Sequence, residues 1–238
     1  MKSPVPDASP PAYDDVADAY GRVLDPEGVG LNDPVLTELL GDIAGQVVLS
    51  LACGQGQDAR LLAGLGATVT GIDISAEMLR RAREHETAHP RGITYVEGTV
   101  QNLAAFSDAS FEGTLCHMAF MDIPDLPPTI QSVARVTRDG GWFVFSIVHP
   151  AYHPHVEILS DYLLDHRYDK QIPVDWLPKH AYHRPLATYV NELARAGYRI
   201  DRLIEVHQRP ERDAGGVPGL LYGRAVKVSY GPERWAGP

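Results

Sequence analysis

Two glycines and an aspartate stand where a nucleotide-binding turn would place them. Gly54 and Gly56 directly follow the apolar run VVLSLAC, and Asp73 ends the run VTGID, 19 positions after Gly54. Glycine lets the backbone lie against a ligand, and a helix that starts after such a turn offers free N–H groups. An acid at a strand tip can accept hydrogen bonds from both hydroxyls of a ribose. The spacing predicts a nucleoside site, at which Ile74 and Met78 would pack on the purine.

The glycine turn alone leaves alternatives open. The segment GQGQDA also matches the dinucleotide pattern G-x-G-x-x-G/A, which is a weak signal by itself. A plain strand-to-helix turn and a nicotinamide-dependent dehydrogenase are therefore the two alternatives. A C-terminal pair of strands and the lack of a second α/β half argue against the dehydrogenase.

Three further residues could hold or move a proton. His149 follows the apolar run GWFVFSIV and is the first candidate for a base or a substrate contact, because histidine titrates near neutral pH. His117 lies inside the run GTLCHMAF and could line the cofactor pocket, and Asp122 could orient a substrate. Each has a structural alternative: a hydrogen bond that holds the chain after the strand, a core histidine, and a helix cap.

The segment HPAYHPH brings His149, His153 and His155 close together in the sequence. This spacing would suit a metal only with a further carboxylate or thiolate. Glu157 is the first acid to follow, and the two prolines favour an irregular loop. The sequence therefore predicts no metal.

Strand-like and helix-like stretches alternate through the middle of the chain. Apolar runs at 46–52, 67–74, 92–98, 113–120 and 141–148 are separated by helix-like stretches at 60–65, 76–86 and 129–136. Strands buried on both faces and joined through helices predict an open, parallel, doubly wound sheet. Two late runs, 198–206 and 218–230, have no helix between them and predict antiparallel neighbours.

These patterns divide the chain into five parts. Residues 1–12 are predicted to be a flexible tail, 13–45 a helical cap, 46–148 the α/β core, and 184–238 a helix with antiparallel strands. The cap has Tyr13, Val16 and Tyr20 at helical spacing, and Asp33 with Pro34 opens a second helix. Residues 149–183 fit neither period, contain no glycine and are rich in aromatic residues, which predicts an inserted lid.

Composition narrows the class of partner. With 31 acidic residues against 21 Lys and Arg, the formal net charge is −10, which disfavours nucleic acid. No apolar run is long enough for a membrane helix, and the N-terminus does not resemble a signal peptide. Cys53 and Cys116 both lie in apolar runs and are read as reduced thiols. The sequence predicts a cytoplasmic protein that acts on a small molecule; its oligomeric state is open.

Several segments together resemble the class I S-adenosylmethionine-dependent methyltransferases. VVLSLACGQG is similar to the family's first motif and VTGIDISAEMLRRAR to its second. YVEGTVQNLAAFSDASFEGTLCHMAFMDIPDL resembles the stretch that covers the adenine, and VARVTRDGGWFVFSIVHP the helix and fifth strand. AYDDVADAYGRVL resembles the N-terminal cap, and HRPLATYVNELARAGYRI the late helix and sixth strand of a bacterial small-molecule branch.

The resemblance implies a seven-stranded, Rossmann-like sheet and S-adenosylmethionine as cofactor. It implies methyl transfer to oxygen, nitrogen or carbon of a small metabolite, in which an aromatic ring is favoured by the lid's aromatics and a lid histidine assists. The alternatives are a cyclisation or rearrangement on the same fold, and a non-catalytic cofactor-binding module. The predicted cofactor contacts are Tyr20, Leu51, Ala52, Cys53, Gly54, Gly56, Asp73, Ile74, Met78, Thr99 and Val100.

The chain departs from the family's pattern at four positions. Ser50 stands where a carboxylate near the methionine end of the cofactor is usual, and Ala52 replaces the first glycine. Thr99 and Asn102 replace acids that are common near the adenine. The resemblance then implies that carbonyls around Leu51 and Ala52 take a larger share of the cofactor's amino group.

Overall fold

The computed structural model describes residues 13–23, 33–152, 162–169, 177, 180–207 and 218–229. Its main sheet has seven strands in the order β3-β2-β1-β4-β5-β9-β8, and a second sheet pairs β6 with β7. The strands are β1 (Val47–Leu51), β2 (Thr68–Asp73), β3 (Thr94–Glu97), β4 (Phe111–His117), β5 (Thr137–Val148), β6 (His166–Asp169), β7 (His180–His183), β8 (Tyr198–Val206) and β9 (Leu220–Lys227).

The direction of the strands confirms the predicted doubly wound sheet. β3, β2, β1, β4 and β5 pair in parallel. β9 pairs antiparallel with both β5 and β8. The antiparallel ending predicted from the sequence is therefore confirmed.

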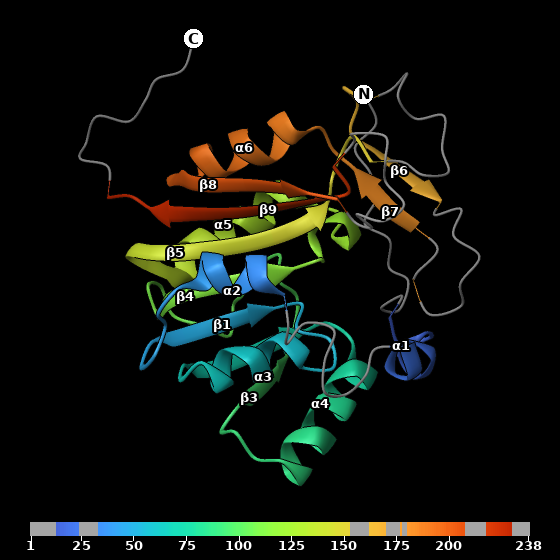
Figure 1. Cartoon of the computed structure of the whole chain (residues 1–238), viewed down its shortest axis with the longest axis vertical. Coiled ribbons are helices and arrows are strands. Elements are labelled where there is room, and N and C mark those ends of the chain that lie inside the picture. Colours follow the sequence, from blue (N-terminus) through green and yellow to red (C-terminus); the bar gives the residue numbers. More distant parts are fainter. Residues whose placement is uncertain are drawn as a thin grey trace.

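Helices cover both faces of the sheet (Figure 1). Leu36 and Leu62 pack with Val144 of β5 in one core, whereas Ile130 and Leu193 pack with the Phe143 and Phe145 side of the same strand in the other. Alternate residues of a strand point to opposite faces, so both sets are buried. The helices are α1 (Ala17–Val23), α2 (Pro34–Leu40), α3 (Gln57–Gly64), α4 (Ala76–Ala88), the 3-10 helix η1 (Phe120–Asp122), α5 (Leu126–Val136) and α6 (Leu186–Arg195).

Caps fix the start of two helices beside the future site. The Asp33 carboxylate accepts hydrogen bonds from the N–H groups of Val35 and Leu36, both at 3.0 Å, at the start of α2. Ser75 accepts one from Met78 N–H at 3.1 Å at the start of α4. Such caps satisfy N–H groups that have no partner within the helix. The predicted start of the second helix at Asp33 and Pro34 is confirmed.

Some boundaries differ from those expected. α3 begins at Gln57 and not at position 60, because Gly56 has φ +82° and turns the chain straight into the helix. β5 begins at Thr137, directly after α5, whereas the sequence placed its start at the glycines. In the predicted lid, β6 and β7 form an antiparallel pair, and strands of four residues are too short to show a clear period. The predicted tail 1–12 and two metal candidates, His153 and His155, lie outside the described residues.

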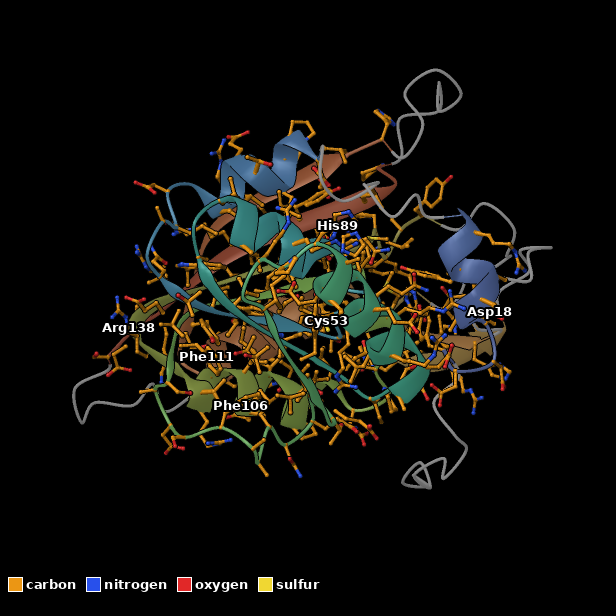
Figure 2. All side chains as sticks on the ribbon, turned by 90° about the horizontal axis from the view of Figure 1, so that it is seen from below. Asp18, Cys53, His89, Phe106, Phe111 and Arg138 are labelled. Atoms are coloured by element: carbon orange, nitrogen blue, oxygen red, sulfur yellow. The ribbon has the colours of Figure 1, made fainter. Side chains whose placement is uncertain are left out.

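Figure 1 shows α1 and the β6–β7 pair at the end of the molecule toward which the arrows of β1 and β5 point. Cys53 lies deep among the packed side chains in Figure 2. Cys53 and Cys116 are both buried free thiols. In the described part of the chain, no helix combines the length and the apolar character that a membrane crossing needs.

Candidate active site

A cavity of about 270 Å³ opens at the carboxyl ends of β1, β2 and β4. β1 pairs with β2 on one side and with β4 on the other, so the strand order reverses here. Open parallel sheets bind their ligands at such a reversal. The cavity is lined by Tyr13, Tyr20, Ala52, Cys53, Gly54, Gln57, Asp58, Asp73, Ile74, Met78, His117, Met118, Ala119, Asp122 and Ile123.

The two glycines of the turn have different structural roles. Both have positive φ, +52° at Gly54 and +82° at Gly56, a region that side chains disfavour. A Cβ added to Gly54 would meet no protein atom within 4 Å, whereas one on Gly56 would lie 2.3 Å from the Tyr95 hydroxyl oxygen. Gly54 therefore leaves open space at the cavity wall, and Gly56 makes room for a neighbouring ring.

Asp73 is held firmly at the end of β2. One carboxylate oxygen accepts a hydrogen bond from Gly54 N–H and the other from Ser75 N–H, both at 2.8 Å. Burial raises the pKa of the Asp73 carboxyl above its ordinary value, although these N–H groups oppose the shift. Since a carboxylate has about four lone-pair sites, Asp73 can still accept hydrogen bonds from ligand hydroxyls in the cavity.

The N-terminal segment covers one side of the cavity. The rings of Tyr13 and Tyr20 pack edge to face, with their centroids 5.9 Å apart. The Gln55 amide donates a hydrogen bond to the Ala17 carbonyl at 2.9 Å, and the Ser75 hydroxyl donates one to the Asp14 carboxylate. These bonds attach the cap to the glycine turn and to the start of α4.

At the β4 end of the cavity, His117 lies between two carboxylates. Its Nδ1 is 3.0 Å from an oxygen of Asp58, and its Nε2 is 3.8 Å from one of Asp33. Burial alone would lower the pKa of His117, but the charges of Asp58 and Asp33 and the hydrogen bond to Asp58 outweigh it and raise this pKa. The Tyr222 hydroxyl donates to the same Asp33 oxygen at 2.7 Å. The arrangement orients the imidazole and favours its protonated form.

Asp122 and Ile123 reach the cavity from a loop that Arg184 holds. The Tyr13 hydroxyl donates a hydrogen bond to Asp122 at 2.8 Å. The buried Arg184 guanidinium donates to the carbonyls of Phe120, Ile123 and Pro124 at 3.0, 2.6 and 2.7 Å. Arg184 directly follows β7, so the β6–β7 pair is tied to the wall of the cavity.

Two cavity residues that are not glycine have left-handed backbone conformations. Ala52 has φ +48° directly after β1, and Met118 has φ +53° directly after β4. Met118 N–H donates hydrogen bonds to the carbonyl and the hydroxyl of Ser146 at 3.0 and 3.1 Å, which hold the turn. Strained residues of this kind cost about 1–3 kcal/mol each and cluster at functional sites.

The charge of the cavity favours a cationic ligand. Asp58, Asp73 and Asp122 line it, and the lining residues from the described part of the chain include neither Lys nor Arg. A dinucleotide would bring a negatively charged diphosphate next to these carboxylates without a basic side chain to meet it. A sulfonium or an ammonium group would instead gain from the charge.

Comparisons with known proteins agree with this geometry. The family described as "Methyltransferase domain" matches residues 49–145. The chain is 38% identical over 112 residues to a ubiquinone biosynthesis O-methyltransferase of Paracidovorax citrulli, and this match covers 46% of this chain and 47% of that protein. It is 34% identical over 107 residues to the enzyme of the same name from Thiobacillus denitrificans, a match that covers 45% of this chain and 46% of that protein. The chain spans about half the length of these curated relatives.

A solved structure matches much more of the chain. An S-adenosylmethionine-dependent methyltransferase from Mesorhizobium loti superimposes with a TM-score of 0.69 at 28% identity, over 83% of this chain and 98% of that one. Residues 49–145 therefore match a methyltransferase domain, and the chain as a whole is similar to S-adenosylmethionine-dependent methyltransferases. The family resemblance, the fold class and S-adenosylmethionine as cofactor, all predicted from the sequence, are confirmed.

The residues present fit this cofactor. Asp73 offers carboxylate oxygens for a ribose, Ile74 and Met78 offer apolar surface beside it, and the open wall at Gly54 admits close approach. When bound, S-adenosylmethionine supplies an activated methyl group on a positively charged sulfur, which suits a cavity rich in carboxylates.

The structure brings most of the predicted site residues together. Nine of them line the cavity: Tyr20, Ala52, Cys53, Gly54, Asp73, Ile74, Met78, His117 and Asp122. Leu51, Gly56, Thr99, Val100 and His149 are not among its lining residues. The Thr99 hydroxyl accepts a hydrogen bond from Gln101 N–H at 3.2 Å. His149 lies in a smaller hollow beside Tyr182, where its Nε2 is 2.8 Å from Glu205.

Sequence reasoning missed Asp58 and Tyr13 as cavity residues. Asp58 is on the first turn of α3, and Tyr13 is in the cap. A helix that starts at Gln57 would have signalled Asp58, since residues of the first turn face the ligand-binding end of the sheet. The aromatic spacing of the cap placed Tyr13 on a helix, but α1 begins only at Ala17 and Tyr13 lies in the turn before it. That spacing gave no sign of its partner Asp122.

Proposed function

We propose that the chain transfers a methyl group from S-adenosylmethionine to oxygen, nitrogen or carbon of a small organic acceptor. The favoured target is a hydroxyl oxygen of an acceptor that contains a ring. One observation carries the proposal. A single cavity has Asp73 at the end of β2 and the His117–Asp58 pair at the end of β4, with β1 between them. The first can hold a ribose and the second can accept a proton.

The protein's main task in this reaction is positioning. A sulfonium methyl is already reactive, so the site needs to hold the acceptor in line with it and to exclude water. Met118, Ala119 and Ile123 give this part of the cavity apolar walls, and Tyr13 and Tyr20 cover it. An acceptor held there would need only to lose a proton as its bond to the methyl carbon forms.

We assign the proton-accepting role to His117. This role belongs to the neutral form of His117, whose population grows as pH rises toward and above its raised pKa. In that form Nδ1–H is donated to Asp58, Nε2 can take a proton from an acceptor hydroxyl or amine, and Asp58 then stabilises the imidazolium. His149 was the first candidate from the sequence, but its Nδ1 accepts a hydrogen bond from Ala151 N–H at 3.0 Å and its Nε2 faces Glu205. It stays the second candidate.

Two observations favour a flat acceptor that carries a hydroxyl. The tyrosine rings of the cap offer flat apolar faces on which a ring can stack. The curated relatives that match half of the chain are named for O-methylation in ubiquinone biosynthesis, which supports oxygen as the acceptor atom.

The test is a methyl-transfer assay with a panel of small phenols, enols and amines. We expect at least one acceptor to gain one methyl group while S-adenosylhomocysteine forms in equal amount. His117→Asn should lower kcat on that acceptor by about a hundredfold or more, the usual contribution of a general base. His149→Asn is the matched control, and we expect it to change kcat by no more than about threefold.

Two results would contradict the proposal. A large loss in His149→Asn with normal activity in His117→Asn would move the proton-accepting role to His149. Methyl transfer itself is wrong in either of two cases. Consumption of an acceptor that gains no methyl group indicates a rearrangement. Failure of every acceptor to react, although S-adenosylhomocysteine binds, indicates a binding module.

A further inference from the structure

The cofactor's methionine half carries an ammonium group that needs an acidic partner in the cavity. β1, which leads into the glycine turn, provides no carboxylate: its sequence is VVLSL, and Ser50 is buried, in register with Gly71 on one side and Leu115 on the other. The ammonium partner must therefore come from another element.

Among the described residues, three carboxylates line the cavity, and two of them are engaged elsewhere. Asp73 lies at the end of β2, where the ribose is expected, and both of its oxygens accept backbone hydrogen bonds. Asp122 accepts the Tyr13 hydroxyl at the cap. Asp58 remains, in the first turn of α3 and four residues after the open wall at Gly54.

The bonds of Asp58 leave it able to accept a second donor. Its oxygens lie 3.0 and 3.2 Å from one nitrogen of His117, so the imidazole contacts it from one direction. A carboxylate can accept about four hydrogen bonds. An ammonium has three donors and no acceptor, so it can bind Asp58 without competing for the proton on His117.

The charges around His117 point the same way. Asp33 and Asp58 flank a single imidazole, so this cluster carries a surplus of one negative charge when His117 is protonated and of two when it is neutral. Asp33 is already satisfied by two N–H groups of α2 and the Tyr222 hydroxyl. The surplus is therefore best met by a cation at Asp58, on the cavity side of the cluster.

We propose that Asp58 binds the ammonium group of the methionine half of S-adenosylmethionine, in place of an acid on β1. The inference rests on the proposed function, because it takes this cavity as the cofactor site. It also replaces the expectation that the carbonyls around Leu51 and Ala52 take the larger share of this contact. Asp58 would thus orient the cofactor and the imidazole of His117 together.

The test compares two ligands that differ in the methionine half. S-adenosylhomocysteine carries the ammonium, and 5′-methylthioadenosine has the same adenosine and a thioether but no amino acid. In calorimetric titration, Asp58→Asn should lower the affinity for S-adenosylhomocysteine by about tenfold or more, as expected for the loss of a charged hydrogen bond. It should change the affinity for 5′-methylthioadenosine by less than about twofold, which also shows that the variant is folded.

Two variants keep the interpretation specific. Asp122→Asn removes another carboxylate of the cavity, the one that accepts the Tyr13 hydroxyl, and should leave the ratio of the two affinities unchanged. His117→Asn should also leave this ratio unchanged or shift it toward S-adenosylhomocysteine, because a neighbouring cation is removed. If Asp122→Asn or His117→Asn produces the selective loss, the ammonium partner is not Asp58 and the inference is overturned.

The outcomes also separate this inference from the proposed function. If the wild-type protein binds neither ligand, the cavity is not a cofactor site and both proposals fall. If it binds both and Asp58→Asn leaves their affinity ratio unchanged, only the role of Asp58 is wrong.

Discussion

The two ends of the cavity are built in different ways. At the β2 end, Gly54 and Asp73 lie 19 residues apart and are joined by a direct hydrogen bond. At the β4 end, Asp33, Asp58, His117 and Tyr222 come from α2, α3, β4 and β9 and meet only in the folded chain. The first end depends on backbone geometry and the second on side chains from distant elements. The β2 end, which we assign to the cofactor and call the cofactor end, is thus built from residues close in the sequence. The β4 end, which we assign to the acceptor and call the acceptor end, is built from residues far apart.

The largest effect that separates the two ends is expected from Asp73→Ala. It removes the carboxylate that we assign to the ribose hydroxyls, so affinity for S-adenosylhomocysteine should fall by about tenfold to a hundredfold. Isothermal titration measures this directly, with 5′-methylthioadenosine as a second ligand that shares the ribose. Both ligands should weaken together. If only S-adenosylhomocysteine weakens, Asp73 does not hold the ribose.

Alanine at each of the two glycines tests the local construction of the cofactor end. Gly54→Ala puts a methyl group into open space, so its cost to stability is limited to the strain of alanine at φ +52°, about 1 kcal/mol. The fold should persist while S-adenosylhomocysteine binds at least about tenfold more weakly. Gly56→Ala forces a Cβ against the Tyr95 ring and should lower the free energy of unfolding by about 2 kcal/mol or more. Urea unfolding and titration on both variants measure the two effects. Equal effects on binding and stability would contradict the division of roles.

The carboxylates around His117 at the acceptor end should make the protein's free energy of unfolding depend on pH. The pKa of His117 is raised in the folded state by Asp58 and Asp33. Protonated His117 therefore stabilises the fold fully below its unfolded pKa of about 6.5, and this contribution is lost as pH rises through the folded value. The stability difference between wild type and His117→Asn should be largest at mildly acidic pH and shrink at alkaline pH.

Urea unfolding of both proteins across this range measures the difference, and Asp58→Asn with and without His117→Asn provides the control. In the absence of Asp58 the effect of pH on the His117 contribution should be smaller, because one of the two carboxylates is gone. A difference that grows toward alkaline pH would contradict the raised pKa.

The smallest effect is expected at Ala52, directly after β1, which lies between the β2 and β4 ends of the cavity. Ala52 occupies a left-handed conformation at the end of β1, where glycine carries less strain. Ala52→Gly should therefore raise the free energy of unfolding by up to about 1 kcal/mol. Thermal or urea unfolding measures it, and Ala63→Gly inside α3, where glycine is unfavourable, is the matched control with the opposite sign. A loss of stability in Ala52→Gly would show that the turn carries no strain.

The features that the sequence predicted are those with local signals, and the features that it missed depend on residues far apart in the chain. The parallel core, the antiparallel ending and the cap of α2 at Asp33 follow from period, apolar runs and capping residues, all of which are local. Gly54, Asp73, Ile74 and Met78 could be placed from the sequence, because strand ends of a parallel sheet meet at one edge. The β6–β7 pair was not foreseen, because its four-residue strands gave no readable period.

The sequence by itself indicated the parallel core, the resemblance to methyltransferases and the Gly54–Asp73 end of the cavity, because short stretches of the chain carry each of these signals. Only the tertiary structure decided which histidine reaches the cavity. His117 and His149 each lie near the end of a parallel strand, yet one meets Asp58 and Asp33 and the other meets Glu205. Those partners are 59, 84 and 56 positions away along the chain, and only packing of the sheet and its helices brings them into contact.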